Sequence, residues 1–482
     1  MHFSTISKVL GILLMLFSIT QLPPAIVAYI YGENEVAVFL DAFLITLISG
    51  CCIWLPVIRS KNELRTRDGF LVTVLFWTVL ASFGAIPLYL LDELNLSVTD
   101  AFFESLSGLT TTGATVITGL DHLPKSILFY RQQLQWLGGM GIIVLAVAIL
   151  PMLGIGGMQL YRAETPGPIK DAKLTPRITE TAKALWYIYL SLTVACCLAL
   201  WLTGMDLFNA ICHSFSTVAI GGFSTRDGSV GDFNLVGTEF VIVIFMIISG
   251  INFALHFFAW RHRSIKHYLS DPEVKAYFFV LTSTCLITVL ILFTTNSYDF
   301  AHSLRYGIFE VVSVATTTGF GTADFSVWPV FLPYMLLWLS FAGGCAGSTA
   351  GGMKMIRVLL IFKQGLREIK LLLHPNAIIP VKLGSNAIPE RVVEAVWGFF
   401  SAYVFLFIAL FLANVATGLD LKTAFSTVAS CINNLGPALG EATVNYSNLP
   451  DASKWILSFA MLLGRLEIFT LLVLLTPTFW RR

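Results

Sequence analysis

Charged residues are scarce in this chain. Only 12% of its 482 residues are Asp, Glu, Lys or Arg, whereas 56% are hydrophobic. Because soluble domains carry about 25% charged residues, this composition excludes a soluble globular protein and predicts a membrane protein with several spans. The formal net charge of +1 indicates neither a strongly acidic nor a strongly basic partner, and no nucleic-acid partner is expected.

Paired cysteines, clustered histidines and enzyme motifs are also missing. The eight cysteines form no C-x-x-C pair and fall mostly in apolar stretches, so neither a disulfide framework nor a metal site is expected. His213 and His256 lie in apolar stretches, where polar packing explains them better than haem ligation. The sequence has no G-x-S-x-G, H-E-x-x-H or G-x-G-x-x-G motif, so it supports neither a membrane enzyme nor a bound cofactor.

What the chain does contain is a short pattern that occurs four times. Each copy has a small residue twelve positions before a final glycine, an apolar residue directly after that small residue, and a serine six positions before the glycine. Copies with a fixed internal frame indicate a structural repeat. The four copies span residues 101–113, 210–222, 307–319 and 424–436.

Each copy is typical of a loop that enters a membrane halfway and turns back. Its apolar part suits a half-membrane helix, since half of a bilayer core takes roughly ten residues at 1.5 Å each. Its end suits an extended strand whose carbonyls, turned to one side by glycine, line a water-filled path. Four such strands would surround a dehydrated cation, which the negative C-terminal ends of the half-helices would favour. Four glycine-interrupted packing helices are the alternative.

These four strands form the predicted selectivity filter. Their side chains differ, so backbone geometry is the only chemistry that they share. The predicted filter residues are Thr110, Thr111, Thr112 and Gly113, then Ala219, Ile220, Gly221 and Gly222, then Thr316, Thr317, Thr318 and Gly319, and finally Asn433, Asn434, Leu435 and Gly436.

Spanning helices are expected on both sides of each pore loop, and ten are predicted in all. Two of them, at about 9–30 and 36–58, precede the repeats, and the Pro23-Pro24 pair should kink the first. The first helices of the repeats are expected at about 70–91, 184–202, 277–293 and 396–412. The second helices are expected at about 134–153, 240–260, 331–362 and 455–475, of which only 331–362 is interrupted.

The predicted fold class is therefore an all-α membrane protein with four pseudo-symmetric helix–pore loop–helix repeats around a central pore. An N-terminal appendix of two helices covers residues 1–68, and the repeats cover 69–175, 176–270, 271–385 and 386–482. Most of the 30 Lys and Arg residues lie at the two ends and in the loops that join the repeats. The positive-inside rule makes that side cytoplasmic, so both termini are expected inside and the pore loops enter from outside.

A polar residue stands nine positions before each final glycine, namely Glu104, His213, Glu310 or Thr427. Two interpretations are open. These side chains could bind the backbone next to the pore helices, or the two glutamates could add negative potential at the filter or its mouth.

Residues 343–352 interrupt the third repeat's second helix. Cys345 is the largest side chain among them, and the others are Gly, Ala, Ser or Thr. Because glycine costs about 1 kcal/mol per helical position against alanine, a loop facing the cavity explains the break; close packing through small residues is the alternative. The stretch differs from a phosphate-binding P-loop, since Lys354 comes one position late and no Ser or Thr follows, so nucleotide binding is not expected.

Arg465 lies in the middle of the predicted helix 455–475, roughly 15 Å from either end. An arginine at this depth costs at least about 2.5 kcal/mol on insertion scales, so it should face protein or a wet cavity. Glu467 follows two residues later and cannot be its partner on the same helix face. Below a cation filter Arg465 would be an electrostatic barrier, and a structural role is the alternative.

Several motifs resemble the Trk/Ktr/HKT superfamily of potassium transporters, in particular the membrane subunits of bacterial Trk systems. The resemblance runs from near residue 1 to the C-terminus. The motifs are LTTTGATV at 109–116, AIGGFS at 219–224, FAGGCAGSTAGGMK at 341–354, NNLGP at 433–437, GRLEIF at 464–469 and PTFW at 477–480.

This resemblance implies K⁺ uptake across a bacterial inner membrane, with K⁺ as the transported ion and no covalent cofactor. It also implies a homodimer and a cytosolic, nucleotide-binding regulatory subunit of the TrkA type, for which the basic loops 162–183 and 363–391 are plausible docking surfaces. In the superfamily a serine in place of the first filter glycine is associated with Na⁺ permeation, so Gly113 favours K⁺. Symport with H⁺ or Na⁺ is the alternative to passive conduction.

The same resemblance implies a gate beneath the filter, formed by a flexible intramembrane loop and a basic constriction. The expected gate residues are Gly343, Gly344, Cys345, Ala346, Gly347, Ser348, Thr349, Ala350, Gly351, Gly352 and Arg465.

Overall fold

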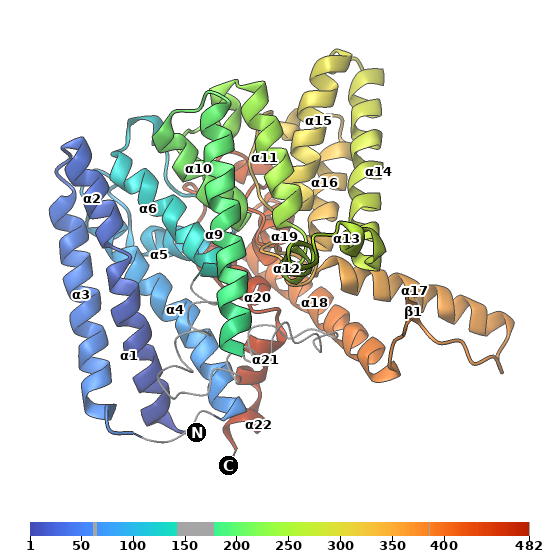
Figure 1. Ribbon diagram of the computed structural model, residues 1–482, viewed down its shortest axis with the longest axis horizontal. Helices are drawn as coiled ribbons and strands as arrows, with labels where there is room; N and C mark the ends of the chain where they lie inside the picture. The colour runs from blue at the N-terminus through green and yellow to red at the C-terminus, as the bar shows by residue number, and fades with distance from the viewer. Residues whose placement is uncertain (61–64, 142–177, 385, 482) are drawn as a thin grey trace.

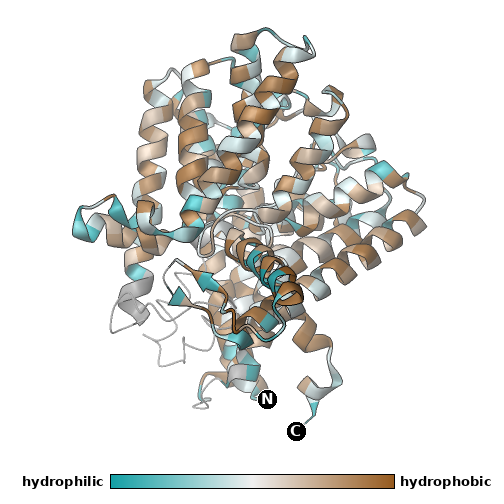
Figure 2. Ribbon diagram, turned by 90° about the vertical axis from the view of Figure 1, so that its right-hand side faces the viewer, coloured by the Kyte–Doolittle hydropathy of each residue, from teal (hydrophilic) through white to brown (hydrophobic). Residues whose placement is uncertain are grey.

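The computed structural model describes residues 1–60, 65–141, 178–384 and 386–481, and α-helices make up most of this part of the chain (Figure 1). The only strands among these residues, β1 (Lys382–Leu383) and β2 (Asn386–Ala387), pair in one small antiparallel hairpin. Hydrophobic residues, shown in brown, predominate along most of the helices (Figure 2). The expected all-α membrane fold is confirmed.

The chain begins with two antiparallel spans that pack against each other. The first is divided into α1 (Phe3–Ile19) and α2 (Leu22–Tyr31), and the second is α3 (Val36–Trp54). The predicted kink lies directly before Pro23-Pro24, since proline can begin a helix but cannot continue one. A Cβ added to Gly11 of α1 would lie 2.8 Å from the carbonyl oxygen of Gly50 in α3, so glycine permits this close helix contact.

Four long helices each precede a short helix at the predicted pore loop, and each long helix packs against the short helix that follows it. All four long helices agree with the predicted first helices of the repeats. The pairs are α4 (Thr66–Leu90) with α5 (Val98–Leu109), α9 (Ile178–Leu202) with α10 (Leu207–Ala219), α14 (Pro272–Thr294) with α15 (Phe300–Ala315), and α18 (Glu390–Ala416) with α19 (Leu421–Ile432).

The short helices, called pore helices below, share one kind of N-terminus. A Ser or Asp side chain accepts a hydrogen bond from the backbone N–H three residues later, at 3.1–3.2 Å, which satisfies one of the unpaired donors of the first turn. The capping residues are Ser97, Asp206, Asp299 and Asp420.

The second helices of the repeats are broken more often than the sequence predicted. The interruption between α16 (Phe331–Ala342) and α17 (Met355–Leu373) was expected. The continuous helices expected at 240–260 and 455–475 are wrong: α11 (Val236–Ser249) meets α12 (Phe253–His262) at 94°, and α20 (Asp451–Arg465) meets α21 (Phe469–Leu475) at 116°.

Local backbone chemistry explains both unexpected breaks. Asn252 caps α12, because its side chain accepts a hydrogen bond from the N–H of Ala254 at 2.8 Å and so starts a new helix. Between α20 and α21, Glu467 and Ile468 have φ of 49° and 60°, values with which a right-handed helix cannot continue.

In the first repeat, α6 (Lys125–Trp136) continues into a π-helical turn, Leu137–Gly141. The rest of the helix expected at 134–153 lies outside the described residues, so the total of ten spans stays a prediction. Six described helices are long and apolar enough to cross a membrane, or up to eight spans if each bent pair is counted as one. Two further short α-helices in the described part of the chain are α13 (Lys266–Ser270) and α22 (Pro477–Trp480).

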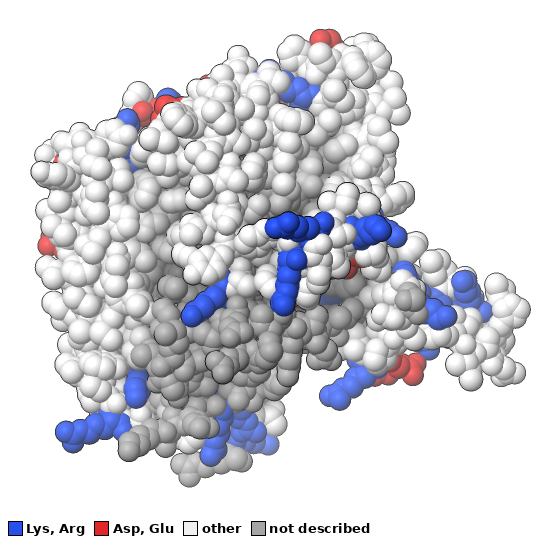
Figure 3. Space-filling view, in the orientation of Figure 1, with Lys and Arg blue, Asp and Glu red and all other residues white. Residues whose placement is uncertain are grey.

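Both termini lie at the same end of the bundle in Figure 1, and α17 with the β-hairpin projects from its side. Most of the Lys and Arg side chains visible in Figure 3 lie over the lower half of that face, which is the half that holds the termini. This distribution has the asymmetry that the positive-inside rule requires.

Candidate functional site

All four pore helices end in the same backbone motif. The residue two positions before each repeat glycine has a left-handed φ of 53–63°, and the residue after it donates its N–H to the carbonyl of the repeat's serine at 2.8–2.9 Å. This is a Schellman ending, which usually has glycine at the left-handed position. Here that position is occupied by Thr111, Ile220, Thr317 and Asn434.

Three of these four residues are β-branched, and such residues rarely adopt a positive φ. Strain of this kind costs about 1–3 kcal/mol per residue and persists only where the surroundings enforce it. The serine that recurs six positions before each repeat glycine therefore lies in the last turn of each pore helix, just before the chain reverses its direction.

The repeat glycines lie against one another in a closed ring. Each has a φ between 81° and 97°, and a Cβ added to any of them would lie 2.0–2.6 Å from the carbonyl oxygen of the residue before the next repeat's glycine. No side chain fits at such a distance. The four contacts run from Gly113 to Gly221, from Gly222 to Thr318, from Gly319 to Leu435, and from Gly436 to Thr112, which closes the ring.

The ring brings the sixteen predicted filter residues together around one axis. The three residues before each glycine are buried, whereas Gly113, Gly222 and Gly319 are partly exposed. Three of the filter carbonyls have protein partners among the described residues: Gly221 accepts a hydrogen bond from Gln135 Nε2 at 2.5 Å, Gly436 accepts one from the Tyr446 hydroxyl at 2.7 Å, and Asn433 accepts one from Gly352 N at 3.1 Å.

Several polar side chains of these segments form hydrogen bonds with other side chains of the protein. Hydroxyl groups pair within a segment, at 2.8 Å for Thr110 with Thr112 and 2.7 Å for Thr316 with Thr318. Asn434 donates from Nδ2 to the Thr112 hydroxyl at 3.0 Å and so joins the fourth segment to the first.

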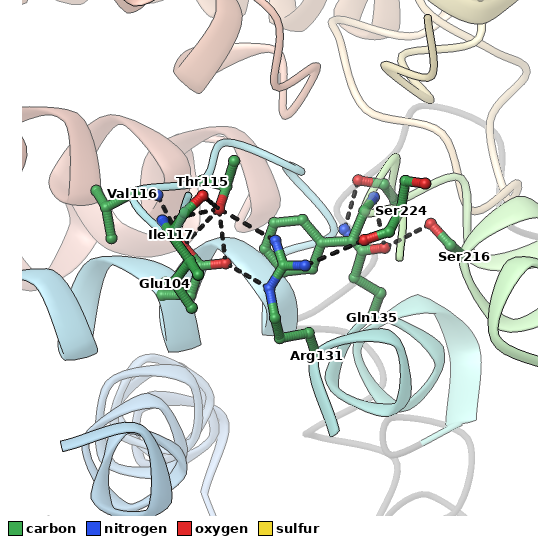
Figure 4. A network of polar contacts seen from close by, with 10 residues as sticks. Glu104, Thr115, Val116, Ile117, Arg131, Gln135, Ser216 and Ser224 are labelled. Carbon is green, nitrogen blue, oxygen red and sulfur yellow. Dashed lines mark hydrogen bonds and ion pairs between the residues drawn. The ribbon is translucent and has the colours of Figure 1, made fainter. Parts of the chain in front are cut away.

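Glu104 anchors the chain that leaves the first filter segment (Figure 4). Its carboxylate accepts hydrogen bonds from Val116 N at 2.8 Å and from the Thr115 hydroxyl at 3.0 Å, and it pairs with Arg131 at 2.8 Å. Arg131 is itself buried and also donates to the carbonyl of Ser224 at 3.1 Å, beyond the second filter segment. The pair therefore ties two segments together.

Glu310 has the same position and the same role in the third repeat. It accepts hydrogen bonds from the backbone N–H groups of Thr322 at 2.7 Å and Ala323 at 3.1 Å. In the second repeat, His213 Nε2 lies 3.0 Å from the Ser224 hydroxyl.

In the fourth repeat the neighbouring Ser426 replaces Thr427 in this role, and its hydroxyl accepts a hydrogen bond from Leu439 N at 3.0 Å. Thr427 instead donates its hydroxyl to the carbonyl of Thr423 at 2.7 Å, within its own helix. The contacts support the packing interpretation for these four positions.

Residues 343–354 lie directly against the ends of the pore helices. Thr349 donates its hydroxyl to the carbonyl of Val218 at 3.1 Å, just before the second filter segment. Gly351 donates its N–H to the Thr317 hydroxyl at 2.7 Å, and Gly352 donates its N–H to the carbonyl of Asn433 at 3.1 Å. This loop thus contacts three of the four segments or their immediate neighbours.

Arg465 makes the link to the first segment. At the end of α20, its guanidinium donates to the Thr111 hydroxyl at 3.1 Å, to the carbonyl of Gly139 at 2.8 Å and to the carbonyl of Thr349 at 3.4 Å. One cation therefore joins the filter segment, the π-helical turn of the first repeat and the loop at 343–354.

Four functional candidates were not predicted from the sequence. Arg131 and Gln135 lie on α6, a buried helix rich in polar residues that begins before the predicted span; Gln135 accepts hydrogen bonds from the Ser216 hydroxyl at 2.6 Å and Phe223 N at 3.1 Å. The unusual density of Arg and Gln beside a repeat was the available signal.

The other two candidates, Glu273 and Glu467, bind the loop at 343–354 or the helix that follows it. Glu273, buried at the start of α14, accepts hydrogen bonds through Oε1 from both Ala346 N at 2.7 Å and Ile356 N at 3.0 Å. Glu467 forms an ion pair with Arg357 of α17. No short-range pattern could have indicated these contacts, which join residues 73 to 110 positions apart.

Together, the fold and this site define a multi-pass membrane protein. Residues 35–481 match the model of the TrkH family, described as cation transport proteins. The chain belongs to this family, so it is a transport protein and not an enzyme.

Its relatives include the "Trk system potassium uptake protein TrkH" of Vibrio parahaemolyticus, with 57% identity, and that of Halomonas elongata, with 56% identity; both alignments cover both chains completely. The protein named TrkG in Escherichia coli is 42% identical over 100% of this chain and 99% of its own length. The crystal structure of the potassium transporter TrkH from Vibrio parahaemolyticus superposes with a TM-score of 0.91 at 54% identity, with complete coverage of both chains.

Proposed function

We propose that this protein takes up K⁺ through a central pore whose selectivity filter consists of residues 110–113, 219–222, 316–319 and 433–436. The closed ring of glycine-to-carbonyl contacts carries the proposal, because it brings four backbone segments to one axis at a distance that excludes side chains. Backbone carbonyls around such an axis can replace the hydration shell of a cation. The relatives' names supply the ion, potassium.

The pore helices add a second contribution to cation binding. Each ends one or two residues before the left-handed turn, so the negative end of its dipole points towards the filter segments. This contribution does not depend on side chains, which agrees with the different side chains of the four segments.

Purified protein in liposomes should take up ⁸⁶Rb⁺ without any other protein, and Gly113→Ser should lower its preference for K⁺ over Na⁺. Glycine at this position has φ of 82°, and a Cβ would lie 2.2 Å from the Gly221 carbonyl, so the ring must widen or distort. The measurement is relative permeability from bi-ionic reversal potentials. Gly119→Ser, another glycine of positive φ but with open space around it, is the matched control. An unaltered permeability ratio in Gly113→Ser would refute the filter assignment.

The same recordings separate passive conduction from symport with H⁺ or Na⁺. For a passive pore, the current reverses at the K⁺ Nernst potential whatever the proton or sodium gradient. A reversal potential that moves with either gradient would indicate coupling.

We further propose that residues 343–352 and Arg465 form the gate of this pore. The loop contacts the second, third and fourth filter segments or their neighbours, and Arg465 connects the loop to the first segment. In this position the loop lies across the end of the filter, and the arginine adds a positive charge to the route of a cation. The pore then opens only when these hydrogen bonds break and the loop moves away from the filter.

Arg465→Ala should raise ⁸⁶Rb⁺ flux by about ten-fold, because hydrogen bonds to a charged group contribute about 1.5–3 kcal/mol each and the loss of even one favours the open state. Arg465→Lys keeps the charge with fewer donors and should give an intermediate flux. Thermal unfolding in detergent reports whether each variant is folded. Equal or lower flux in folded Arg465→Ala protein would indicate a purely structural role.

Glu273→Gln should raise flux by a few-fold. Glu273 accepts hydrogen bonds from Ala346 N within the gate loop and from Ile356 N just after it, and an amide oxygen binds such N–H groups with about half the strength of a carboxylate. Glu394→Gln, an exposed position on α18, makes the same charge change away from the gate and should leave flux unaltered. If both variants conduct equally, Glu273 does not hold the gate closed.

The orientation, the partner and the oligomeric state belong to the same proposal. The basic side of the bundle, with both termini, would face the cytoplasm of a bacterial cell, where loops such as 363–391 would contact a nucleotide-binding subunit of the TrkA type. A homodimer would explain α17, whose exposed hydrophobic side chains are spaced along one projecting helix: Phe362, Leu366, Ile369, Leu372 and Leu373. The division into five parts at 68, 175, 270 and 385 stays a prediction.

A further inference from the structure

A separate cavity of about 690 Å³ opens on the side of the bundle, between α9, α12, α13 and α14. Its lining is almost wholly apolar, with side chains such as Ile188, Leu192, Ile251, Trp260 and Phe278. Cavities of this size bury most of the surface of a small apolar ligand. In a multi-pass membrane protein, the apolar molecules available to enter such an opening are lipids.

Three exposed basic residues, called the rim below, are neighbours of the lining residues in the sequence. Arg261 directly follows Trp260, Lys266 directly follows Ile265, and Arg263 lies between these two lining residues. Figure 3 shows Lys and Arg side chains gathered over α12 and α13. None of the three forms an ion pair with another described residue.

The nearest carboxylates in the sequence are occupied elsewhere. Asp271 caps α14 by accepting hydrogen bonds from Glu273 N and Val274 N at 2.8 and 3.0 Å, and Glu273 binds the gate loop. The rim therefore has positive charge available for an anion at the edge of the membrane.

The walls of the cavity are held in place without a ligand. On α12, His256 Nε2 is 3.0 Å from the carbonyl oxygen of Ile248 on α11. Its Nδ1 is 2.8 Å from the hydroxyl oxygen of Tyr268 on α13. These two contacts fix three elements around the cavity, so a ligand would find a site that is already formed.

The cavity also adjoins the proposed gate. Ile251 lines it from the break between α11 and α12, and the residues on either side of this break bind the gate loop. Gly250 accepts a hydrogen bond from Cys345 N at 2.8 Å, and Phe253 donates its N–H to the carbonyl of Gly347 at 3.0 Å. An occupant that presses on Ile251 acts on the segment that holds this loop.

We propose that this cavity and its basic rim form a binding site for an anionic phospholipid, with an acyl chain among α9, α12 and α14 and the phosphate against Arg261, Arg263 and Lys266. Basic pockets between spanning helices suit the phosphate of such lipids. The lipid comes from the leaflet that faces the basic loops. Its binding does not depend on the proposed transport function, whereas an effect of the lipid on ion flux rests on that function.

The test is native mass spectrometry of the full-length protein titrated with phosphatidylglycerol or phosphatidylcholine of equal chain length. The wild type should bind phosphatidylglycerol more tightly. Each basic side chain near a membrane surface contributes about five-fold in affinity, so Arg261→Gln/Arg263→Gln/Lys266→Gln should weaken phosphatidylglycerol binding about 100-fold and leave phosphatidylcholine binding unaltered. Arg59→Gln/Arg67→Gln/Arg481→Gln removes three exposed basic side chains elsewhere and should retain the preference.

A second pair of variants tests the acyl chain. Ala195→Trp fills the cavity from α9 and should reduce binding of both lipids, whereas Val194→Trp, on an adjacent exposed position that does not line the cavity, should not. Retained preference for phosphatidylglycerol in the rim variant, or unaltered lipid binding in Ala195→Trp, would overturn the proposal. Conversion of dimers to monomers by Ala195→Trp with lipid binding intact would also overturn it, because a second copy of the chain would then cover the cavity.

Discussion

Four backbone segments approach one axis so closely that only glycine fits where they meet, and the rest of the structure depends on this contact. Each glycine lies against the carbonyl of the next segment, so no segment can move without displacing its neighbour. Each capped pore helix leads directly into one of these segments. The long helix packed against it holds the pore helix in position. A cation path made of backbone is the functional consequence that we propose.

The ring is held from outside by buried polar contacts. The second residue of each segment has a left-handed conformation, which Thr and Ile adopt only under constraint. Glu104 and Glu310 bind the chain just beyond the glycines, and Arg131 joins two repeats through Glu104. Removal of one partner from a buried pair of this kind costs about 3–5 kcal/mol. These buried contacts therefore provide the constraint that keeps the strained residues near the axis in their left-handed conformations.

The parts that could be predicted from sequence are those in which local geometry demands a residue type. The ring requires glycine at 113, 222, 319 and 436, so the fixed spacing of the four copies could be recognised in the sequence. The length of the apolar stretches predicted the long helices. The breaks at Gly250–Asn252 and Leu466–Ile468 were not predicted, because the apolar residues on both sides of each break together have the length of one span. Asn252, which caps α12, was the local signal for the first break. Glu273 and Arg131 were missed because their partners are distant in sequence or belong to another repeat.

The most direct test of a backbone cation site is X-ray diffraction from crystals grown in Rb⁺, with anomalous scattering recorded at the rubidium edge. The account predicts anomalous peaks on the axis shared by Gly113, Gly222, Gly319 and Gly436, and their loss when Rb⁺ is replaced by Na⁺. Rubidium peaks that lie only away from this axis, at comparable occupancy and resolution, would contradict it.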